Sequence, residues 1–408
     1  IVDPNITLDS LNLTLGSFYQ DEIVVEPADV ISVIATATLI QQDGLIDQCC
    51  QIMEETINIE TVSKYYETAQ LYGCGQVQSS CLNWLKVNLL SHLPEHPDKL
   101  RQVPIDLMTK LIGHAELFVM QTEFSVYVLL RLWVYLIFHP GWTGTPQEAV
   151  MASHKFFQDR VSRDKRFFLS TTEGTPYAPV FKALRFFHLV NHHMDMDMLL
   201  KDKIIPSKWM SIVYQHQWQL LLRADQGVDR GPQTMTEEEF EKHCLRCGRT
   251  LNRYFYITVL FENISSQLFL FFSGNQPHMW RWTGFNMGLD LIVTFDNFGI
   301  TLKRSLNTSG NVEHEALLSN HKKRHLYYRV SVVSLNGQKQ AVYQASSGIK
   351  AVTLNKNQTH EMLKVDKRKA TFPLLLSFNF AVTTPLIGET ESLDSSDNEE
   401  EEQIENIN

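Results

Sequence analysis

The spacing of hydrophobic residues changes once along this chain and divides it into two kinds of structure. Between residues 58 and 224, apolar side chains recur every three or four positions, as in amphipathic helices. Thr61–Tyr72 is predicted to be one such helix, ended by Gly73 in a left-handed conformation. Phe124–Phe138 is apolar almost throughout, but it is too short to cross a membrane and contains Arg131. We therefore expect a central core helix there.

Beyond Trp280, apolar and polar positions approach the strict alternation that is typical of half-buried β-strands. Asn336-Gly337, between two such runs, is the strongest hairpin signal in the chain. The predicted strands are Leu289–Phe295, Gly299–Lys303, Leu326–Leu335, Gln340–Gln344, Ala351–Leu354 and Phe372–Val382. Short strands at this spacing indicate a small antiparallel sandwich, so the predicted fold class is multidomain α+β.

Two other segments carry weaker patterns. In the first 57 residues, Asp21–Val25 is predicted as a short strand, Pro27 as the first residue of a helix, and Asp43 as the cap of the next helix. The stretch from Gly141 to Pro176 is polar and is predicted to be rich in loops.

Charge is distributed unevenly along the 408 residues. The formal net charge is -10, but the segment from Glu389 to Asn408 holds nine acidic residues and no basic ones, which leaves 37 acidic against 36 basic residues elsewhere. The body thus has no excess positive charge for binding phosphate backbones, and we expect no nucleic-acid partner. The acidic tail, residues 389–408, is predicted to be disordered. We also expect no membrane span and an intracellular protein with reduced cysteines.

Catalytic signatures are not found. The sequence contains none of four common motifs: the phosphate-binding loop, the nucleophile elbow, the zinc-protease helix and the dinucleotide fingerprint. We therefore expect a protein that is not an enzyme and needs no cofactor. Cys244 and Cys247 have the spacing of half a zinc site, which His243 and His278 would have to complete. The alternative, which we favour, is a pair of free thiols near a domain junction.

Further histidines and two short basic runs have ordinary explanations. His188, His192 and His193 have spacing found in metal sites, but no carboxylate partner is placed by pattern, so a solvated helix end is favoured. The basic runs at 321–325 and 364–369 match nuclear-import signals and also fit turns between strands.

The string Trp280-Arg-Trp-Thr-Gly-Phe-Asn-Met-Gly288 is the most unusual in the chain. Trp280, Arg281, Trp282 and Phe285 are candidates for a recognition surface, because tryptophan and arginine are enriched at binding hot spots. The alternative is that the two tryptophans alternate into the sandwich core with Arg281 exposed between them, and we favour this interpretation.

Several strings resemble a known family. Residues 17–25 and 35–50 resemble the second half of a BTB domain, and residues 58–73, 81–85 and 117–134 look like a BACK domain. Three strings narrow the match, namely Ile205-Pro-Ser-Lys-Trp-Met-Ser-Ile-Val-Tyr214, Arg246-Cys-Gly-Arg249 and Trp280-Arg-Trp-Thr-Gly-Phe-Asn286. With them, the chain resembles the germ cell-less family of BTB–BACK proteins over most of residues 1–385.

The resemblance implies a substrate adaptor of a cullin-3 ubiquitin ligase, associated with germ-cell formation, the nuclear envelope, the nucleus and the cytoplasm. The BTB domain would form a homodimer in the full-length parent and dock cullin-3, while the far end binds the client. The alternative is a nuclear-envelope scaffold, or an interaction protein that regulates transcription, without a ligase role. The implied domains are 1–57 (second half of BTB), 58–224 (BACK-like) and 225–388 (β-rich), followed by the tail.

The implied interaction residues lie at the two ends. Tyr65, Tyr66, Ala69 and Tyr72 are the candidates for the cullin interface, with Tyr66 expected to be the most exposed. The tryptophan string supplies the client-surface candidates. Three features depart from the family pattern. The first half of the BTB domain is missing, residues 254–277 form a very apolar insert that is either genuine or a gene-model artefact, and the acidic tail is not part of the pattern.

Overall fold

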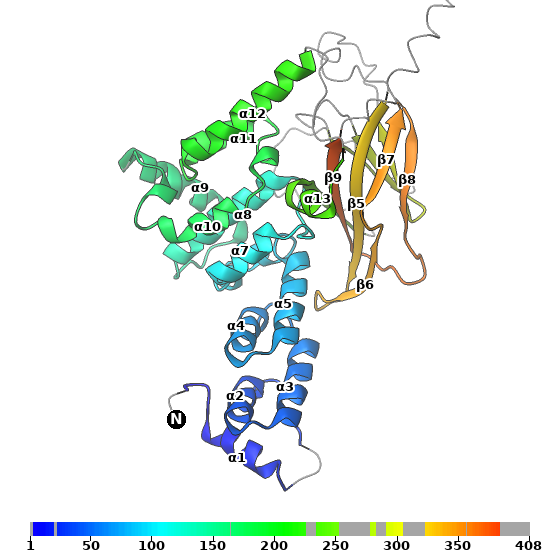
Figure 1. The fold of residues 1–408 in the computed structure, drawn as a ribbon. Helices are drawn as coiled ribbons and strands as arrows, with labels where there is room; N and C mark the ends of the chain where they lie inside the picture. The colour runs from blue at the N-terminus through cyan, green and yellow to red at the C-terminus, as the bar shows by residue number, and fades with distance from the viewer. Residues whose placement is uncertain are drawn as a thin grey trace, which may run out of the picture.

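The computed structural model describes residues 3–19, 23–163, 165–225, 234–252, 278–282, 291–304, 323–355 and 357–383. Within these ranges the chain is a mixture of helices and antiparallel sheets, which confirms the predicted α+β class. A column of helices leads from the N-terminus into a wider helical body, and a pair of sheets lies beside that body (Figure 1). The insert at 254–277 and the tail at 389–408 lie outside the described residues.

The N-terminal column consists of helices packed one upon the next (Figure 1). They are α1 (Leu8–Gly16), α2 (Val30–Ile40), α3 (Asp43–Glu55), α4 (Val62–Tyr72) and α5 (Gly75–Asn88). Gly73 ends α4 with a φ of 76°, as predicted. Other local predictions are wrong: Ile23–Val25 forms no strand, Pro27 precedes α2 in a turn, and Asp43 opens α3 without a side-chain capping bond.

The helical body is built around α8 (Glu123–Phe138), whose residues from Glu123 to Leu136 are almost all buried. This confirms the predicted central helix. The other elements of the body are the helices α6 (Pro97–Leu100), α7 (Ile105–Gly113), α9 (Pro146–Arg163), α10 (Ala178–Lys182), α11 (His193–Asp202) and α12 (Ser207–Asp225), and the 3₁₀ turns η1 (Leu93–Glu95), η2 (Phe168–Ser170), η3 (Thr175–Tyr177) and η4 (Phe186–His188). Arg131 is tolerated inside α8 because it pairs with buried Asp202 at 2.9 Å.

Helix α9 corrects the prediction of a loop-rich stretch between Gly141 and Pro176. Its start is a capping box: the Thr145 backbone N–H donates to Glu148 at 2.8 Å, and the Glu148 backbone N–H donates to the Thr145 hydroxyl. Its buried side chains, Ala149, Ser153 and Phe157, repeat every four residues. The sequence therefore carried a helix signal that its polar composition obscured.

The β-domain contains two antiparallel sheets that share one apolar core. The strands are β1 (Leu245–Leu251), β2 (His278–Trp282), β3 (Leu291–Asp296), β4 (Gly299–Arg304), β5 (Lys323–Leu335), β6 (Ala341–Ser346), β7 (Lys350–Asn355), β8 (Thr359–Lys364) and β9 (Leu374–Thr383). One sheet has the order β1-β9-β5-β6 with β7 also pairing to β5, and the other has the order β2-β3-β4-β8. A short helix, α13 (Glu237–His243), precedes β1. The arrangement agrees with the predicted sandwich.

The hairpin between β5 and β6 forms where the sequence predicted it, but with a longer loop. Asn336–Gln340 connect the strands, and Lys339 rather than Gly337 has a positive φ, of 62°. The Asn336 side chain accepts hydrogen bonds from the backbone N–H groups of Gln338 and Gln340, at 2.9 and 2.8 Å. Asparagine thus stabilises a wider turn than the two-residue type that Asn-Gly usually forms.

Candidate protein-interaction surfaces

Three of the four candidates for the cullin interface on α4 are buried. Tyr65, Tyr66 and Ala69 are each no more than 2% exposed. The Tyr66 ring lies beneath Lys110 of α7, whose ammonium donates to the Tyr66 hydroxyl at 2.8 Å, and Tyr65 bonds Thr56 at 3.1 Å. The expectation that Tyr66 is exposed is wrong, because Lys110 of α7 covers it.

Tyr72, at the end of α4, anchors the N-terminal segment. Its hydroxyl donates to Asp3 at 2.7 Å and accepts from the Asn5 amide at 2.9 Å. Burial is the main cause of its raised pKa, so the hydroxyl stays protonated and able to donate. Tyr72 therefore joins chain segments rather than offering a free aromatic anchor.

The surface of α4 that remains open to solvent is narrow and mixed in character. Lys64, Glu67 and Leu71 are exposed at spacings of three and four residues, which places them along one side of the helix. Leu71 is 65% exposed and is the apolar member of the three. This stripe, rather than the tyrosines, is the surface that α4 offers to a partner.

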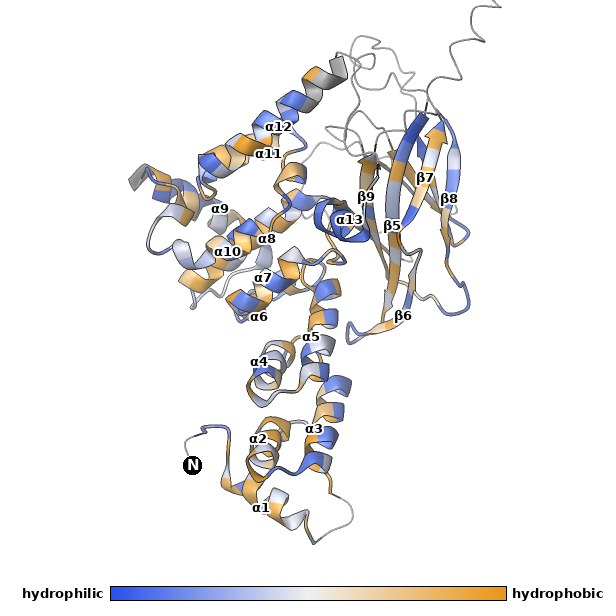
Figure 2. Cartoon of the chain, viewed as in Figure 1, coloured by the Kyte–Doolittle hydropathy of each residue, from blue (hydrophilic) through white to orange (hydrophobic). Residues whose placement is uncertain are grey.

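The start of the chain carries the densest set of exposed apolar side chains. They lie on α1, in the segment after it and at the end of α2, at the foot of the column in Figure 2, and they are Leu8, Leu15, Phe18, Tyr19, Val24 and Leu39. Each is at least 49% exposed, and Tyr19 is 90% exposed. Soluble proteins seldom expose apolar groups this densely except where something covers them.

The tryptophan string lies mostly outside the described residues. Strand β2 pairs with β3, with Trp280 opposite Val293 and Trp282 opposite Leu291. Only the backbone of this strand is described, so the side chains of Trp280, Arg281 and Trp282, and Phe285 altogether, lie outside the described residues. The choice between a recognition surface and a core position for these residues stays open.

A fully buried ion pair joins the helical body to the β-domain. Arg246 in β1 donates to both carboxylate oxygens of Glu123 in α8, at 3.1 and 2.6 Å, and also to the carbonyls of Ile112 and His114, each at 2.8 Å. The Arg185 backbone N–H donates to Glu123 at 3.0 Å. Burial by itself raises the pKa of Glu123, but Arg246 and the Arg185 backbone outweigh it and hold that pKa below its usual value.

Gly248 brings β1 close to the helical body. A Cβ at this position would lie 2.6 Å from the Val119 carbonyl oxygen and 2.9 Å from that of Leu376. The Gln121 backbone N–H donates to the Gly248 carbonyl at 3.0 Å. In the string Arg246-Cys-Gly-Arg249, Arg246 and Gly248 therefore contact the helical body and hold the β-domain against it.

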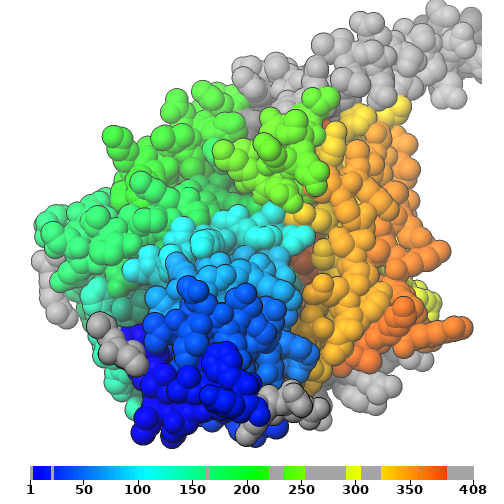
Figure 3. All heavy atoms as spheres, turned by 60° about the horizontal axis from the view of Figure 1, so that its bottom comes forward, coloured from blue at the N-terminus to red at the C-terminus, as the bar shows by residue number. Residues whose placement is uncertain are grey.

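The β5–β6 hairpin makes a second joint lower on the column. Gln340 donates to the carbonyls of Glu55 and Ile57 at 3.1 and 3.2 Å, and Asn88 of α5 donates to the Lys339 carbonyl at 3.0 Å. In the view from below, the N-terminal helices and the β-domain lie side by side (Figure 3). The β-domain therefore contacts both the helical body, through Arg246, and the column, through the hairpin.

We expect Gln340→Ala to lower the free energy of unfolding by about 1 kcal/mol, because two carbonyls lose their donor. Urea unfolding followed by tryptophan fluorescence measures this change. Gln344→Ala, at an exposed position of β6, is the matched control and should change stability by less than about 0.5 kcal/mol. If the two substitutions lower the free energy of unfolding equally, the hairpin loop does not stabilise the column.

Among the side chains that the structure describes, Cys244 and Cys247 belong to no metal-binding group; the side chain of His278 lies outside them. Cys244 and Cys247 are both buried free thiols. Arg185 donates to the sulfur of Cys244 at 2.7 Å, and the Cys247 thiol lies 3.8 Å from the Phe378 carbonyl. Burial raises the pKa of Cys247, so it stays a thiol rather than a metal-binding thiolate. The burial of both thiols favours the free-thiol interpretation.

The histidines near α11 have structural partners. His188 bonds the His243 carbonyl at 2.7 Å, and the His192 ring accepts from the Met194 backbone N–H at the start of α11. Among the residues that the structure describes, the potential metal-binding group lies elsewhere, at His92, Glu95 and His96. Within the same ranges, no helix is both long and apolar enough to cross a membrane.

The described fold defines a two-part α+β protein in which a helical part and a β-sandwich are joined by a buried contact between Arg246 and Glu123. No family model matches the chain. It is 38% identical over 411 residues to Protein germ cell-less of Drosophila melanogaster, covering 94% of this chain and 67% of that protein. It is 34% identical to Germ cell-less protein-like 1 of Homo sapiens over 389 residues (94% and 70%), and 33% identical to the human Germ cell-less protein-like 2 over 386 residues (94% and 68%).

These similarities place the chain in the germ cell-less family. They run over nearly its whole length rather than over one shared module, so the helical and sheet parts both belong to the family pattern. The names of these relatives associate the family with germ cells.

Proposed function

We propose that this protein is a non-catalytic adaptor that recruits a client protein to a cullin-3 ubiquitin ligase. Residues 1–57 act as the second half of a BTB domain, residues 58–224 as a BACK domain, and residues 225–388 as the client-binding domain. It works at the nuclear envelope, in the nucleus and on the cytoplasmic side, during germ-cell development. Family membership supports this proposal, because the sequence resemblance to BTB–BACK adaptors runs through the same residues.

The observation that carries the proposal is the rigid connection between two ends of different character. One end exposes apolar side chains from Leu8 to Leu39, and the other is a β-sandwich. The buried Glu123–Arg246 pair and the hairpin loop fix the distance between them. A ligase adaptor needs such a connection, because ubiquitin transfer requires the client to be held at a defined place relative to the recruited enzyme.

In this proposal, cullin-3 contacts the N-terminal column, and the exposed stripe of α4 replaces the buried tyrosines as the contact on the BACK side. Leu71→Asp is expected to weaken cullin-3 binding about tenfold or more, because it puts a charge into a contact that excludes water. Co-purification of the epitope-tagged chain with cullin-3 from cells measures this effect. Met151→Asp, at a 70% exposed position of α9, is the matched control and should leave binding unchanged.

A scaffold at the nuclear envelope, or a transcription-regulating interaction protein, would use the same surfaces without any ligase. The stability of the bound client separates these functions. Proteins captured with the chain should become longer-lived when the chain is removed from cells, as measured by pulse-chase labelling. Unchanged half-lives for all captured proteins would favour the scaffold and contradict the adaptor proposal.

A further inference from the structure

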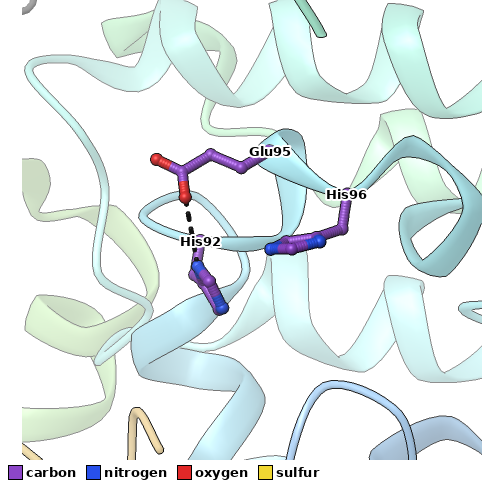
Figure 4. A group of neighbouring side chains, drawn as sticks. All are labelled: His92, Glu95 and His96. Atoms are coloured by element: carbon purple, nitrogen blue, oxygen red, sulfur yellow. Dashed lines mark hydrogen bonds and ion pairs between the residues drawn. The ribbon is translucent and has the colours of Figure 1, made fainter. Parts of the chain in front are cut away.

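The turn between α5 and α6 gathers three side chains with metal-binding atoms. His92 precedes the 3₁₀ turn η1, Glu95 ends it, and His96 leads into α6. Residues three apart eclipse one another in a 3₁₀ turn, so His92 and Glu95 fall on the same side. Figure 4 shows the Glu95 carboxylate facing the His92 ring, with His96 beside them. One ligand atom from each of the three lies within 4.8 Å of the other two.

We propose that His92, Glu95 and His96 bind a divalent transition-metal ion, with zinc as the best match. Two imidazole nitrogens and one carboxylate oxygen are a donor set that zinc accepts, with a fourth position left for water or a partner's side chain. Ligand atoms of a tetrahedral zinc are about 3.3 Å apart. His92 Nδ1 and Glu95 Oε2 are 3.3 Å apart, which matches this spacing, and the three ligand atoms must draw together from within 4.8 Å.

The backbone that carries these ligands is firmly held. The His92 backbone N–H donates to Asn88 at 2.9 Å, and the His96 backbone N–H donates to Leu93 at 2.9 Å. The Leu93 side chain is 1% exposed, and Pro94 restricts the turn from within. A preformed backbone limits the cost of ordering the site when the ion binds.

The charges that face the site are Glu95, the two imidazoles and Lys339 of the hairpin loop. Lys339 weakens the attraction for a cation, so we expect moderate rather than tight binding.

The position of the metal-binding turn suggests a structural role for the ion. The turn follows α5, and Asn88 at the end of α5 holds the Lys339 carbonyl of the hairpin. An ion that fixes the turn would therefore stiffen the point where the helical column, the helical body and the β-domain meet. Because zinc binds the folded chain, it should raise the midpoint of thermal unfolding as its concentration rises.

The test is titration of the metal-stripped full chain with zinc chloride by calorimetry, together with elemental analysis after gel filtration. The expected result is about one zinc per chain with a dissociation constant below about 0.1 mM. Glu95→Gln and His96→Ala should each weaken binding about tenfold or more. His193→Ala, an exposed histidine of α11, is the control and should change nothing.

Two results would overturn the proposal. One is the absence of saturable zinc binding by the wild-type chain. The other is binding that survives both Glu95→Gln and His96→Ala, which would place the ion on other side chains. Circular dichroism of each variant shows whether it is folded, and these exposed or half-buried positions should tolerate the substitutions.

Discussion

Glu123→Gln should lower the free energy of unfolding by about 3–5 kcal/mol, among the largest effects of any single substitution in this chain. Arg246 would remain buried between the helical body and β1 with its charge uncompensated, and removing one member of a buried ion pair costs about this much. The Arg185 backbone N–H would also lose a charged acceptor. Urea unfolding at neutral pH measures the difference.

Glu116→Gln is the matched control for this substitution. The Glu116 carboxylate pairs with Lys86 at 3.1 Å, but its side chain is 50% exposed, so its loss should cost less than about 1 kcal/mol. The substitution at Glu123 should also loosen the contact between the two parts, which limited proteolysis would detect as a new cleavage near β1. If both variants unfold at the same urea concentration, the ion pair is not what joins the parts.

Asp202→Asn should have an effect of similar size, about 3–5 kcal/mol, inside the helical body. The Asp202 carboxylate accepts hydrogen bonds from Tyr127 at 2.9 Å and Arg131 at 2.9 Å, and its other oxygen lies 2.8 Å from His154. Asp202 and Arg131 are each 1% exposed, so no water can replace the lost charge. Glu173→Gln, which breaks the exposed Arg160 pair at 2.9 Å, should change stability by less than about 1 kcal/mol.

Asp202 also makes stability depend on pH. Burial raises the pKa of Asp202, but His154 and Arg131 outweigh it and hold that pKa below its usual value. A carboxylate with a lowered folded-state pKa stabilises the protein above its unfolded-state pKa of about 4, and this contribution is lost as the pH falls through the folded-state pKa. At pH values below 4, the urea concentration at the unfolding midpoint should therefore fall more steeply with decreasing pH for the wild type than for Asp202→Asn. Parallel curves would contradict this account.

Elements with strong local patterns could be predicted from the sequence. The unbroken apolar run of α8 and the glycine that ends α4 specify their structure locally, as does the alternation in β5. Strand β1 was missed because arginines at 246 and 249 are atypical of a buried strand. Arg246 is tolerated there only because Glu123, more than 100 residues earlier, supplies the opposite charge.

The exposure of the interaction residues on α4 was harder to predict. Helical periodicity identifies one buried side of a helix, but it does not show when a second side is also covered. Tyr66 lies off the stripe that faces α5, so it was expected to be exposed, but α7 supplies Lys110 to cover it. The metal-binding turn was missed for another reason: Pro94 stands between His92 and Glu95, so the segment matches no helical metal motif. In both cases the deciding contact comes from tertiary structure or an irregular turn.

The most direct test of the adaptor proposal is the affinity of the full-length parent protein for the cullin-3 N-terminal domain, measured by analytical ultracentrifugation and biolayer interferometry. The account predicts a stable complex with a dissociation constant of about 1 µM or lower, equivalent to about -8 kcal/mol of binding free energy. The Leu71→Asp variant, still folded, should bind more weakly. No complex at concentrations of about 10 µM, with the wild-type protein folded and soluble, would contradict the proposal that this protein recruits a cullin-3 ligase.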